Sequence, residues 1–432
     1  MLYRSTNNNS PKVNFKEATI KGLAPDKGLY FPETIPSLDK KLIDNIGQFS
    51  NEEIAFNVIK PYVDDVIPND ELIRIVSETI NFDFPLIKID ENIFSLELYH
   101  GPTLAFKDVG ARFMSRCLGY FVKNENKKIT VLVATSGDTG GAVANGFYDV
   151  DGVDVVILYP SGKVSSVQEL QLTTLGKNIT ALEIDGTFDD CQKMVKEAFA
   201  DEELNKELFL TSANSINVAR WLPQQFYYFF AWKQWAEKAN PPVMSVPSGN
   251  FGNICAGLLA KCSGLPIRHF IAACNANDVV TEYLETGDYL PKKSLTTISN
   301  AMDVGSPSNF VRILELFDQQ LISLKNNLSS YSFTDDETKA VLKEVFLDKK
   351  YLLDPHGAVG YAALKKYLHE HKNMSGILLE TAHPVKFYDV VEPIIEQAVP
   401  MPSAINDLLM LKKESLKMNS DYKELKDYLL SQ

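Results

Sequence analysis

Five short apolar runs, each followed by polar or glycine-rich residues and then a helical stretch, constrain the fold of this chain most strongly. The run at residues 128–134 is β-branched or apolar after its first residue, like a strand buried on both faces, and the other runs look similar. A repeated strand–loop–helix order is typical of α/β folds with open, mostly parallel sheets and flanking helices. Ligands of such sheets bind at the carboxyl ends of the strands. The five predicted strands are residues 128–134, 153–159, 181–184, 243–246 and 270–273.

The length of 432 residues predicts two or three domains, at roughly 100–200 residues per domain. We divide the chain into an N-terminal helical domain at 1–95, a first α/β region at 96–240 and a second at 241–432 that ends in C-terminal helices. These boundaries are approximate, because sheets of this kind exchange segments. Within the second region, the polar residues 325–336 are predicted as a surface connection, and the tail from Leu408 as an amphipathic helix.

The net charge of −13 argues against nucleic acid as a partner, because a phosphate backbone needs a basic protein face. A few buried basic side chains can still form a positive pocket for a small anion. No run of 18 apolar residues occurs, which predicts no membrane span, and the first 15 residues lack the apolar stretch of a secretory signal. The five cysteines form no CxxC pair. They predict core thiols, no metal site and a cytoplasmic location.

The sequence SGNFGN at residues 248–253 lies between a predicted strand and an apolar helical run. Gly249 and Gly252 let the backbone approach a ligand closely, and the start of the next helix offers free N–H groups to an anion. The segment has neither the GK[ST] of a nucleotide-binding P-loop nor the spacing of GxGxxG. It is predicted as a phosphate cradle, with an ordinary tight turn as an equally good alternative.

Two other polar segments have a similar place in the pattern. The sequence TSGDTGG at residues 135–141 follows a predicted strand and presents hydroxyl and N–H groups suited to a carboxylate or phosphate, although Ser, Asp and Thr are also favoured helix caps. The sequence NSINVAR at residues 214–220 places Arg220 near the start of a long aromatic helix. An arginine fork matches phosphate, but a helix cap with a surface arginine is the simpler interpretation of that segment alone.

The sequence HGPTLAFKD at residues 100–108 places Lys107 after a predicted strand and turn, close to Leu104 and Phe106. A lysine that such neighbours partly desolvate has a lowered pKa and becomes a nucleophile. The alternative is a lysine that extends to solvent beside Asp108, which is the commoner situation for lysine.

Together these segments contain the parts that a pyridoxal-phosphate enzyme needs. Such an enzyme uses a lysine that forms an imine with the cofactor, a cradle for the cofactor phosphate and a separate site for the carboxylate of an amino acid. The combination therefore predicts pyridoxal-phosphate chemistry, which no single segment does.

Five motifs resemble the threonine synthase family, with the closest match to its bacterial and fungal branch. In chain order they are HGPTLAFKD, ATSGDTG, NSIN followed by Arg220, VPSGNFGN and TAHPVKF. The resemblance runs from about Gly22 to about Pro400. It implies a fold-type II pyridoxal-phosphate enzyme, similar to the tryptophan synthase β-subunit, with two open, mostly parallel twisted sheets and an N-terminal helical domain. It also implies that O-phospho-L-homoserine and water are converted to L-threonine and phosphate, the last step of threonine biosynthesis.

The resemblance implies roles for individual residues around the cofactor, pyridoxal 5'-phosphate. Lys107 matches the Schiff-base lysine, and Thr381 matches the hydroxyl residue that faces the pyridine nitrogen. Asp138 stands near the position beside the phenolic oxygen of the cofactor, where relatives often have asparagine, so its role departs from the family pattern. The loop that holds the cofactor phosphate matches Gly249, Asn250, Phe251, Gly252 and Asn253.

Substrate residues are implied in the same way. The loop that binds the substrate carboxylate matches Ser136, Gly137 and Thr139. The residues suited to the substrate phosphate are Ser215, Asn217 and Arg220, with Lys163 of YPSGK as a further candidate. The resemblance favours a monomer. We expect no activation by S-adenosylmethionine, because the chain has no long N-terminal extension of the plant type.

Two rival functions use the same patterns. A related lyase would release 2-oxobutyrate and ammonia from a γ-phosphorylated amino acid, with the same lysine and cradle. A nucleotide-binding oxidoreductase or regulatory module would need a dinucleotide fingerprint with an acidic residue about 20 positions later, and the sequence has none.

Overall fold

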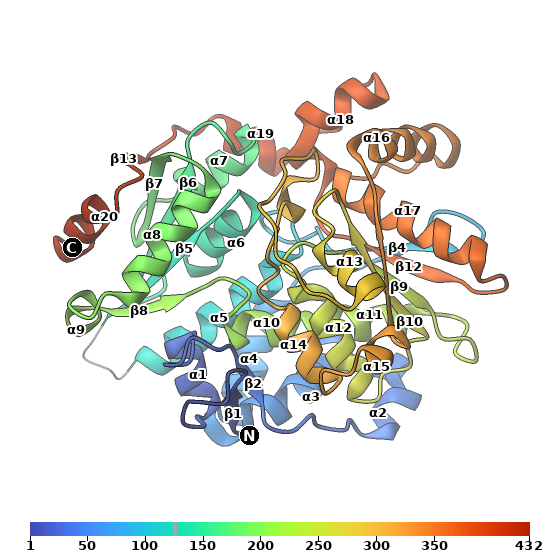
Figure 1. The fold of residues 1–432 in the computed structure, drawn as a ribbon, viewed down its shortest axis with the longest axis horizontal. Helices are drawn as coiled ribbons and strands as arrows, with labels where there is room; N and C mark the ends of the chain where they lie inside the picture. Colours follow the sequence, from blue (N-terminus) through green and yellow to red (C-terminus); the bar gives the residue numbers. More distant parts are fainter. Residues whose placement is uncertain (124–127) are drawn as a thin grey trace. The chain divides into compact units, whose positions relative to one another are not determined.

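The computed structural model describes residues 1–123 and 128–432, and its chain forms two compact units (Figure 1). Unit 1 comprises Met1, Phe31–Phe106 and Trp221–Pro400, and unit 2 comprises Leu2–Tyr30, Lys107–Arg220 and Met401–Gln432. Each unit contains one large, mostly parallel sheet, which confirms the predicted fold class. Both units are discontinuous in sequence. The predicted division near residues 95 and 240 stays a prediction.

The sheet of unit 1 has six strands in the order β11-β10-β9-β12-β4-β3. Neighbouring strands are parallel, except that β3 runs antiparallel to β4 at the edge. The central strands β10 and β12 are buried along their whole length, as their apolar sequences predict. The strands are β3 (Leu86–Lys88), β4 (Ile93–Glu97), β9 (Val243–Pro247), β10 (His269–Cys274), β11 (Leu328–Ser332) and β12 (Gly376–Glu380).

The helices of unit 1 include two that position the candidate site. Helix α12 begins directly after β9, and α17 packs against both β9 and β12. Ser245 on β9 donates a hydrogen bond to the carbonyl of Gly360 on α17 (2.7 Å). The α-helices are α2 (Lys40–Asp44), α3 (Asn51–Val63), α4 (Asn69–Thr79), α11 (Phe226–Gln234), α12 (Gly252–Cys262), α13 (Val279–Thr286), α14 (Phe310–Leu316), α15 (Leu321–Lys325), α16 (Asp335–Glu344), α17 (Pro355–Glu370) and α18 (Tyr388–Ile395). The shorter turns include η3 (Leu222–Gln225), η4 (Asn300–Met302) and η6 (Pro384–Phe387).

The sheet of unit 2 has five strands in the order β13-β7-β6-β5-β8, and every neighbouring pair is parallel. Its strands are β5 (Ile129–Ala134), β6 (Val153–Pro160), β7 (Ile179–Asp185), β8 (Phe209–Ser212) and β13 (Leu416–Asn419). Its helices are α1 (Phe15–Lys21), α5 (Lys107–Val122), α6 (Asp138–Phe147), α7 (Ser166–Thr173), α8 (Phe188–Ala200), α9 (Leu204–Glu207), α19 (Ser403–Leu409) and α20 (Tyr422–Leu430). Strand β1 (Tyr3–Ser5) belongs to this unit, while β2 (Tyr30–Pro32) and α10 (Val218–Trp221) lie at its boundary.

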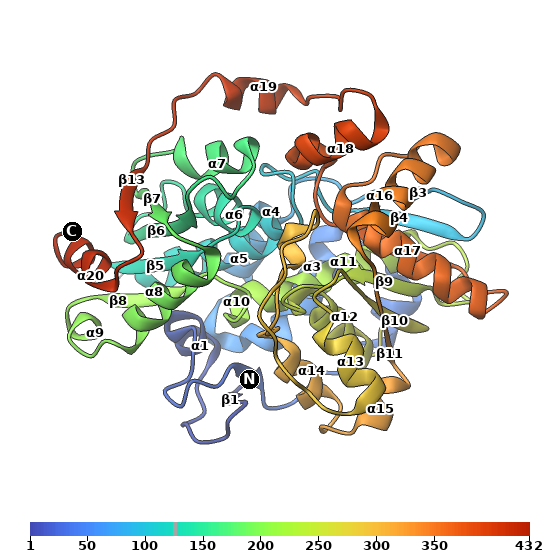
Figure 2. The same ribbon diagram turned by 45° about the horizontal axis from the view of Figure 1, so that its top comes forward.

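All five predicted strands are present, but two other predictions were wrong. Strand β11 lies within residues 325–336, which were predicted as a surface connection, and β13 lies within the tail that was predicted as a helix. Both are edge strands, and β13 is visible beside β7 in Figure 2. Most of their side chains are half-buried or exposed, so they lack the apolar run that marks a central strand. Only α20 confirms the helical part of the tail prediction.

The C-terminal helix α20 contributes to the core of unit 2. Leu425 and Leu429 pack in one apolar cluster with Leu132, Leu158 and Leu182 from the three central strands. Residues 401–432 are therefore an integral part of this unit. Among the described residues, no helix combines the length and apolar content that a membrane span requires.

Candidate active site

Lys107 is the first residue of α5, and its Nζ atom lies 3.7 Å from Oδ2 of Asp138 at the start of α6. The lysine side chain is 18% exposed and the aspartate side chain 4% exposed. This placement favours the predicted desolvated lysine over a solvated one. It also brings together two residues that the sequence assigned to the cofactor.

The predicted loop 135–141 follows β5 and opens α6, as expected. Its turn is held by Thr135, whose Oγ1 accepts hydrogen bonds from the N–H groups of Gly137 (2.9 Å) and Gly140 (2.8 Å). Gly137 has a φ of +133°, which side chains rarely adopt, and a Cβ there would lie 2.4 Å from the Gln168 side chain. Ser136 and Thr139 are half-buried on this turn.

The predicted substrate-phosphate segment forms a turn before α10. The amide of Asn217 donates to the carbonyls of Thr19 (2.8 Å) and Ser212 (3.2 Å), and its Oδ1 accepts from the N–H of Ala219 (3.0 Å). Because both amide ends are engaged, these contacts favour a role for Asn217 in holding the turn. Ser215 is half-buried beside it.

Arg220 is buried and donates from Nη1 to the carbonyl of Ala213 in the same turn. Gly110 of α5 packs directly against it, since a Cβ at that glycine would lie 3.1 Å from the arginine Nε. The guanidinium is therefore fixed between the turn and α5. Lys163, the weaker candidate, is exposed on the turn after β6.

In unit 1, the loop 248–253 connects β9 to α12, as predicted. Phe251 has a φ of 60°, a left-handed conformation that costs a bulky residue on the order of 1–3 kcal/mol. Asn250 fixes the loop on one side, because its carbonyl accepts from the N–H of Asn309 (3.2 Å). On the other side of the loop, Gly249 packs closely against Ala301, since a Cβ at the glycine would lie 2.8 Å from the Ala301 carbonyl oxygen. Strained backbone of this kind is common in ligand-binding loops.

Asn253 tests whether this loop suits a cofactor phosphate. It is 5% exposed, and its Oδ1 accepts from the hydroxyl of Tyr228 (2.9 Å). Its Nδ2 has no hydrogen-bond partner in the parts of the chain that the structure describes. A buried donor without a hydrogen-bond partner costs about 1–3 kcal/mol of folding stability. It stands in the first turn of the 11-residue helix α12, where free N–H groups favour an anion, so the residues present fit a phosphate.

Thr381 follows β12 and is buried next to the segment that leads to Lys107. Its carbonyl accepts from the N–H of Phe106 (2.9 Å), and the carbonyl of Leu104 accepts from the N–H of His383 (3.0 Å). Leu104 has a φ of 57°, a second left-handed bulky residue. This short antiparallel pairing therefore fixes the backbone up to Phe106, and the next residue in the chain is Lys107.

Two residues that hold the backbone before Lys107 were not identified from the sequence. Lys386 is fully buried and donates from Nζ to the carbonyl of Thr103 (2.9 Å). Tyr227 of α11 donates from its hydroxyl to the carbonyl of Phe106. A lysine in TAHPVKF is expected to be solvated, and Tyr227 lies 121 positions after Phe106, so only the tertiary structure reveals either contact.

Comparison with known proteins identifies the chain's relatives over its whole length. The family described as "Pyridoxal-phosphate dependent enzyme" matches residues 83–379, "Threonine synthase N terminus" matches 2–80 and "Threonine synthase, C-terminal" matches 357–429. A threonine synthase of Haemophilus influenzae is 46% identical over 420 residues, which are 97% of each chain. The crystal structure of threonine synthase from Escherichia coli has a TM-score of 0.93 and 40% identity, and covers 100% of both chains. A structure of PLP-bound threonine synthase from Brucella melitensis has a TM-score of 0.92 and 36% identity, and covers 99% of this chain and 98% of that one.

The chain belongs to the threonine synthase family.

Membership of the threonine synthase family fixes the class of chemistry. The chain is a pyridoxal-phosphate-dependent lyase of the fold-type II group, with pyridoxal phosphate as its cofactor and a small molecule as its substrate. Lys107 and the loop 248–253 lie inside the region that matches the pyridoxal-phosphate enzymes, and Thr381 lies inside the C-terminal match. The roles of individual site residues stay predictions.

A buried acid lies directly before Thr381 in this threonine synthase family member. Glu380 is fully buried at the end of β12, and its Oε1 accepts from the N–H of Asp354 (2.6 Å). Burial first, and the nearby Asp354 second, raise the pKa of Glu380 well above its usual range. The Asp354 carboxylate accepts from the N–H of Gly357 (2.7 Å) and contacts the ring of His356. Burial therefore favours the neutral form of Glu380.

Replacing Glu380 by glutamine should reduce the loss of stability at alkaline pH. The pKa of Glu380 is higher in the folded than in the unfolded chain, where it is about 4.3. Its contribution to stability is therefore full below that value and lost as pH rises through the folded-state pKa. Glutamine stays neutral and keeps an acceptor for the Asp354 N–H. Urea unfolding of both proteins from pH 6 to pH 9 measures this, and parallel stability curves would contradict it.

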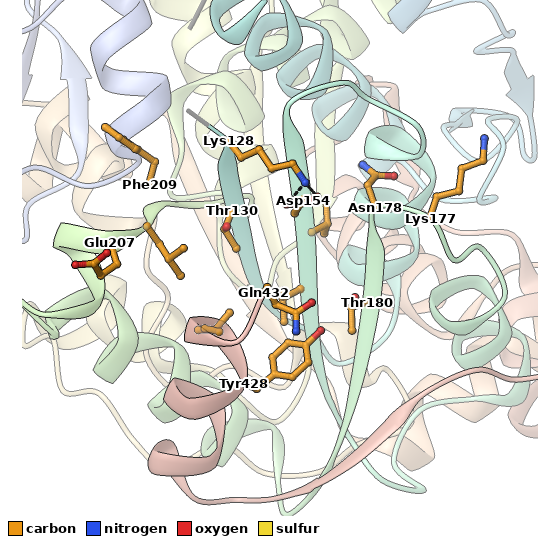
Figure 3. Close-up of a pocket in the computed structure, with 14 residues that line it drawn as sticks. Lys128, Thr130, Asp154, Lys177, Asn178, Thr180, Glu207, Phe209, Tyr428 and Gln432 are labelled. Carbon is orange, nitrogen blue, oxygen red and sulfur yellow. Dashed lines mark hydrogen bonds and ion pairs between the residues drawn. The ribbon is translucent and has the colours of Figure 1, made fainter. Parts of the chain in front are cut away.

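A groove of about 370 Å³ in unit 2 lies away from the predicted residues. Figure 3 shows Lys128 directed at Asp154 near the starts of β5 and β6, with Tyr428 and Gln432 on the opposite wall. The lysine Nζ and aspartate Oδ2 are 3.0 Å apart. The groove is at the amino ends of the parallel strands, whereas loop 135–141 follows the carboxyl end of β5. It therefore contains none of the candidate catalytic residues.

Proposed function

We propose that this chain converts O-phospho-L-homoserine and water to L-threonine and phosphate, as a monomer in the cytoplasm. Similarity to threonine synthases over the full length supports the reaction. The observation that carries the proposal is Lys107, which is mostly buried with its amine 3.7 Å from Asp138. The free thiols of all five cysteines are consistent with a reducing compartment.

The cofactor would be held by the predicted cofactor residues, each described above. The ε-amino group of Lys107 would bind its aldehyde carbon. The loop 248–253 would bind its phosphate through backbone N–H groups and the Asn253 amide. Thr381 would face the pyridine nitrogen. When bound, pyridoxal phosphate supplies an electron sink for the negative charge that develops at the substrate carbons.

Lys107 would move the protons of the reaction. Its neutral amine accepts a proton at Nζ from the carbon next to the substrate amine, and the ammonium form later returns one to that carbon. A lysine performs both transfers well only when its pKa lies near the working pH. The hydroxyl of Thr381 is neutral, so it would leave the pyridine nitrogen largely unprotonated, which a carboxylate at that position would not do.

The substrate would be bound at its two anionic ends. Ser136, Gly137 and Thr139 would bind the carboxylate through hydroxyl and N–H groups at the start of α6. Arg220 and Ser215 would bind the phosphate and stabilise it as it leaves with the electrons of the carbon–oxygen bond. Asn217 would hold the turn that carries them. Lys163 is on an exposed turn and would act through its charge.

An assay with O-phospho-L-homoserine tests the proposed function. Threonine and phosphate should form in equal amounts from the purified protein loaded with pyridoxal phosphate. Formation of 2-oxobutyrate and ammonia instead of threonine would identify the related lyase and overturn the proposal. Light scattering of the same sample measures whether the protein is a monomer.

A further inference from the structure

Gln168 is a buried glutamine whose side chain amide is engaged at both ends. It lies on α7 and is 1% exposed. Its Oε1 accepts from the N–H of Ser165 (3.1 Å), and its Nε2 donates to Oδ1 of Asp138 (2.9 Å). The two contacts fix the orientation of the amide, because the acceptor must face the N–H and the donors must face the carboxylate.

Asp138 connects this amide to the candidate catalytic lysine. One carboxylate oxygen accepts from Gln168, and the other lies 3.7 Å from Nζ of Lys107. An anion at that distance favours the protonated form of a lysine. A rotation of the carboxylate would change this distance, and the hydrogen bond from Gln168 favours the observed orientation.

The backbone of the loop is shaped around the same glutamine. A Cβ at Gly137 would lie 2.4–2.7 Å from the three outer atoms of the Gln168 side chain, and the φ of +133° there also excludes most side chains. Gly137 thus leaves room for the amide between α7 and the start of α6. The close packing of Gln168 against Gly137 and its hydrogen bond to Asp138 both indicate that Gln168 is part of the candidate site.

The charged residue that follows Gln168 in the chain has partners other than Asp138. The neighbouring Glu169 accepts from Lys413 (2.6 Å) and from the hydroxyl of Tyr159 (3.3 Å). On α5, Asp108 is buried next to Lys107 in the chain. The Asp138 carboxylate accepts a hydrogen bond from Gln168 on one oxygen and lies near the Lys107 amine on the other.

We propose that Gln168 is a positioning residue that fixes the Asp138 carboxylate against Lys107 and thereby sets the protonation of the lysine amine. The inference rests on the proposed role of Lys107. It gives Asp138 a function that its departure from the asparagine of relatives left open: Asp138 supplies a fixed negative charge, and Gln168 supplies the donor that holds it.

The variant Gln168→Glu separates this role from a structural one. A glutamate keeps the acceptor for the Ser165 N–H, as in a common helix capping box, but replaces the donor by a second anion facing Asp138. The pKa of Lys107 should rise by about one unit, since a like charge a few ångströms from Asp138 adds to its field. The measurement is the rate of acetylation of Lys107 against pH in the full-length, cofactor-free protein, followed by mass spectrometry. At a fixed pH below the pKa, labelling should slow about tenfold.

Ser165→Ala is the matched control, because it removes the N-cap of α7 and leaves the Gln168 side chain in place. It should lower thermal stability without moving the labelling profile. An unchanged profile in Gln168→Glu, or an equal shift in both variants, would overturn the proposal.

A second variant covers the case in which Gln168→Glu alone does not fold. The double variant Asp138→Asn plus Gln168→Glu exchanges the amide and the carboxylate, so the hydrogen bond is restored with the charge farther from Lys107. Its labelling pKa should be at or below that of the wild type, and a raised value would contradict the inference. Protection of Lys107 by pyridoxal phosphate in the wild type tests the proposed function separately, since its failure would remove the cofactor role and leave the labelling result standing.

Discussion

Replacing Lys107 by alanine is expected to abolish threonine formation and the visible absorbance of the lysine-bound cofactor. The expected loss in turnover is roughly 10⁴-fold or more, because a general base contributes up to about that factor and, in the proposed function, this lysine would also hold the cofactor. Turnover and the absorbance spectrum of the purified variant measure the two effects. A variant that keeps both turnover and absorbance would show that another residue binds the cofactor and transfers the protons.

The structure indicates that this loss would be chemical and not a failure to fold. The backbone up to Phe106 is held by Thr381, Tyr227 and the neighbouring pairing, and none of these contacts involves the Lys107 side chain. Asp138 would keep its hydrogen bond from Gln168. The midpoint of thermal unfolding should therefore change little. Lys128→Ala, in the groove at the amino end of β5, is a suitable control and should keep full activity.

Replacing Arg220 by methionine is expected to lower kcat/KM for O-phospho-L-homoserine by about 10²–10³-fold, with cofactor affinity unchanged. The reason is electrostatic: the departing phosphate loses a fixed cation. Methionine roughly preserves the buried volume next to Gly110. Steady-state kinetics and a titration of the cofactor-free protein with pyridoxal phosphate measure the two quantities.

Arg220→Lys tests which property of the arginine is needed. Lysine keeps the charge but not the planar fork that donates to the Ala213 carbonyl and, in the proposed function, would also donate to a phosphate. An intermediate loss is expected. Equal losses of turnover and cofactor affinity in the methionine variant would instead assign Arg220 to the framework of the cofactor site.

The sequence predicted the central strands and the positions of the functional loops, because both depend on local patterns. The apolar run ITVLVA becomes β5, and TSGDTGG follows it as the turn into α6. Lys107 was predicted as the Schiff-base residue from its motif and its apolar neighbours, and that role stays a prediction. In each case the signal lies within about ten residues of the element it predicts.

The contacts that define the site could not be predicted in this way. Gln168 is 30 positions from Asp138, and Lys386 is 283 positions from Thr103. Judged by residue type alone, without the tertiary structure, a glutamine on a helix and a lysine before phenylalanine are expected on the surface. The edge strands β11 and β13 were missed for a related reason: their pairing with β10 and β7 compensates for a polar sequence, and nothing in that sequence shows the partner.

The composition of unit 2 from three separate stretches of chain has a consequence for biosynthesis. Leu425 and Leu429 complete the apolar cluster that supports β5 and β6, and they are translated some 300 residues after Lys107. In a ribosome-bound nascent chain that ends before these residues, the sheet of unit 2 thus lacks the edge strand β13 and the covering helix α20. The core of unit 2 is therefore completed only when residues 401–432 have been translated, and premature termination within residues 411–430 should yield an unstable product and not a slow enzyme.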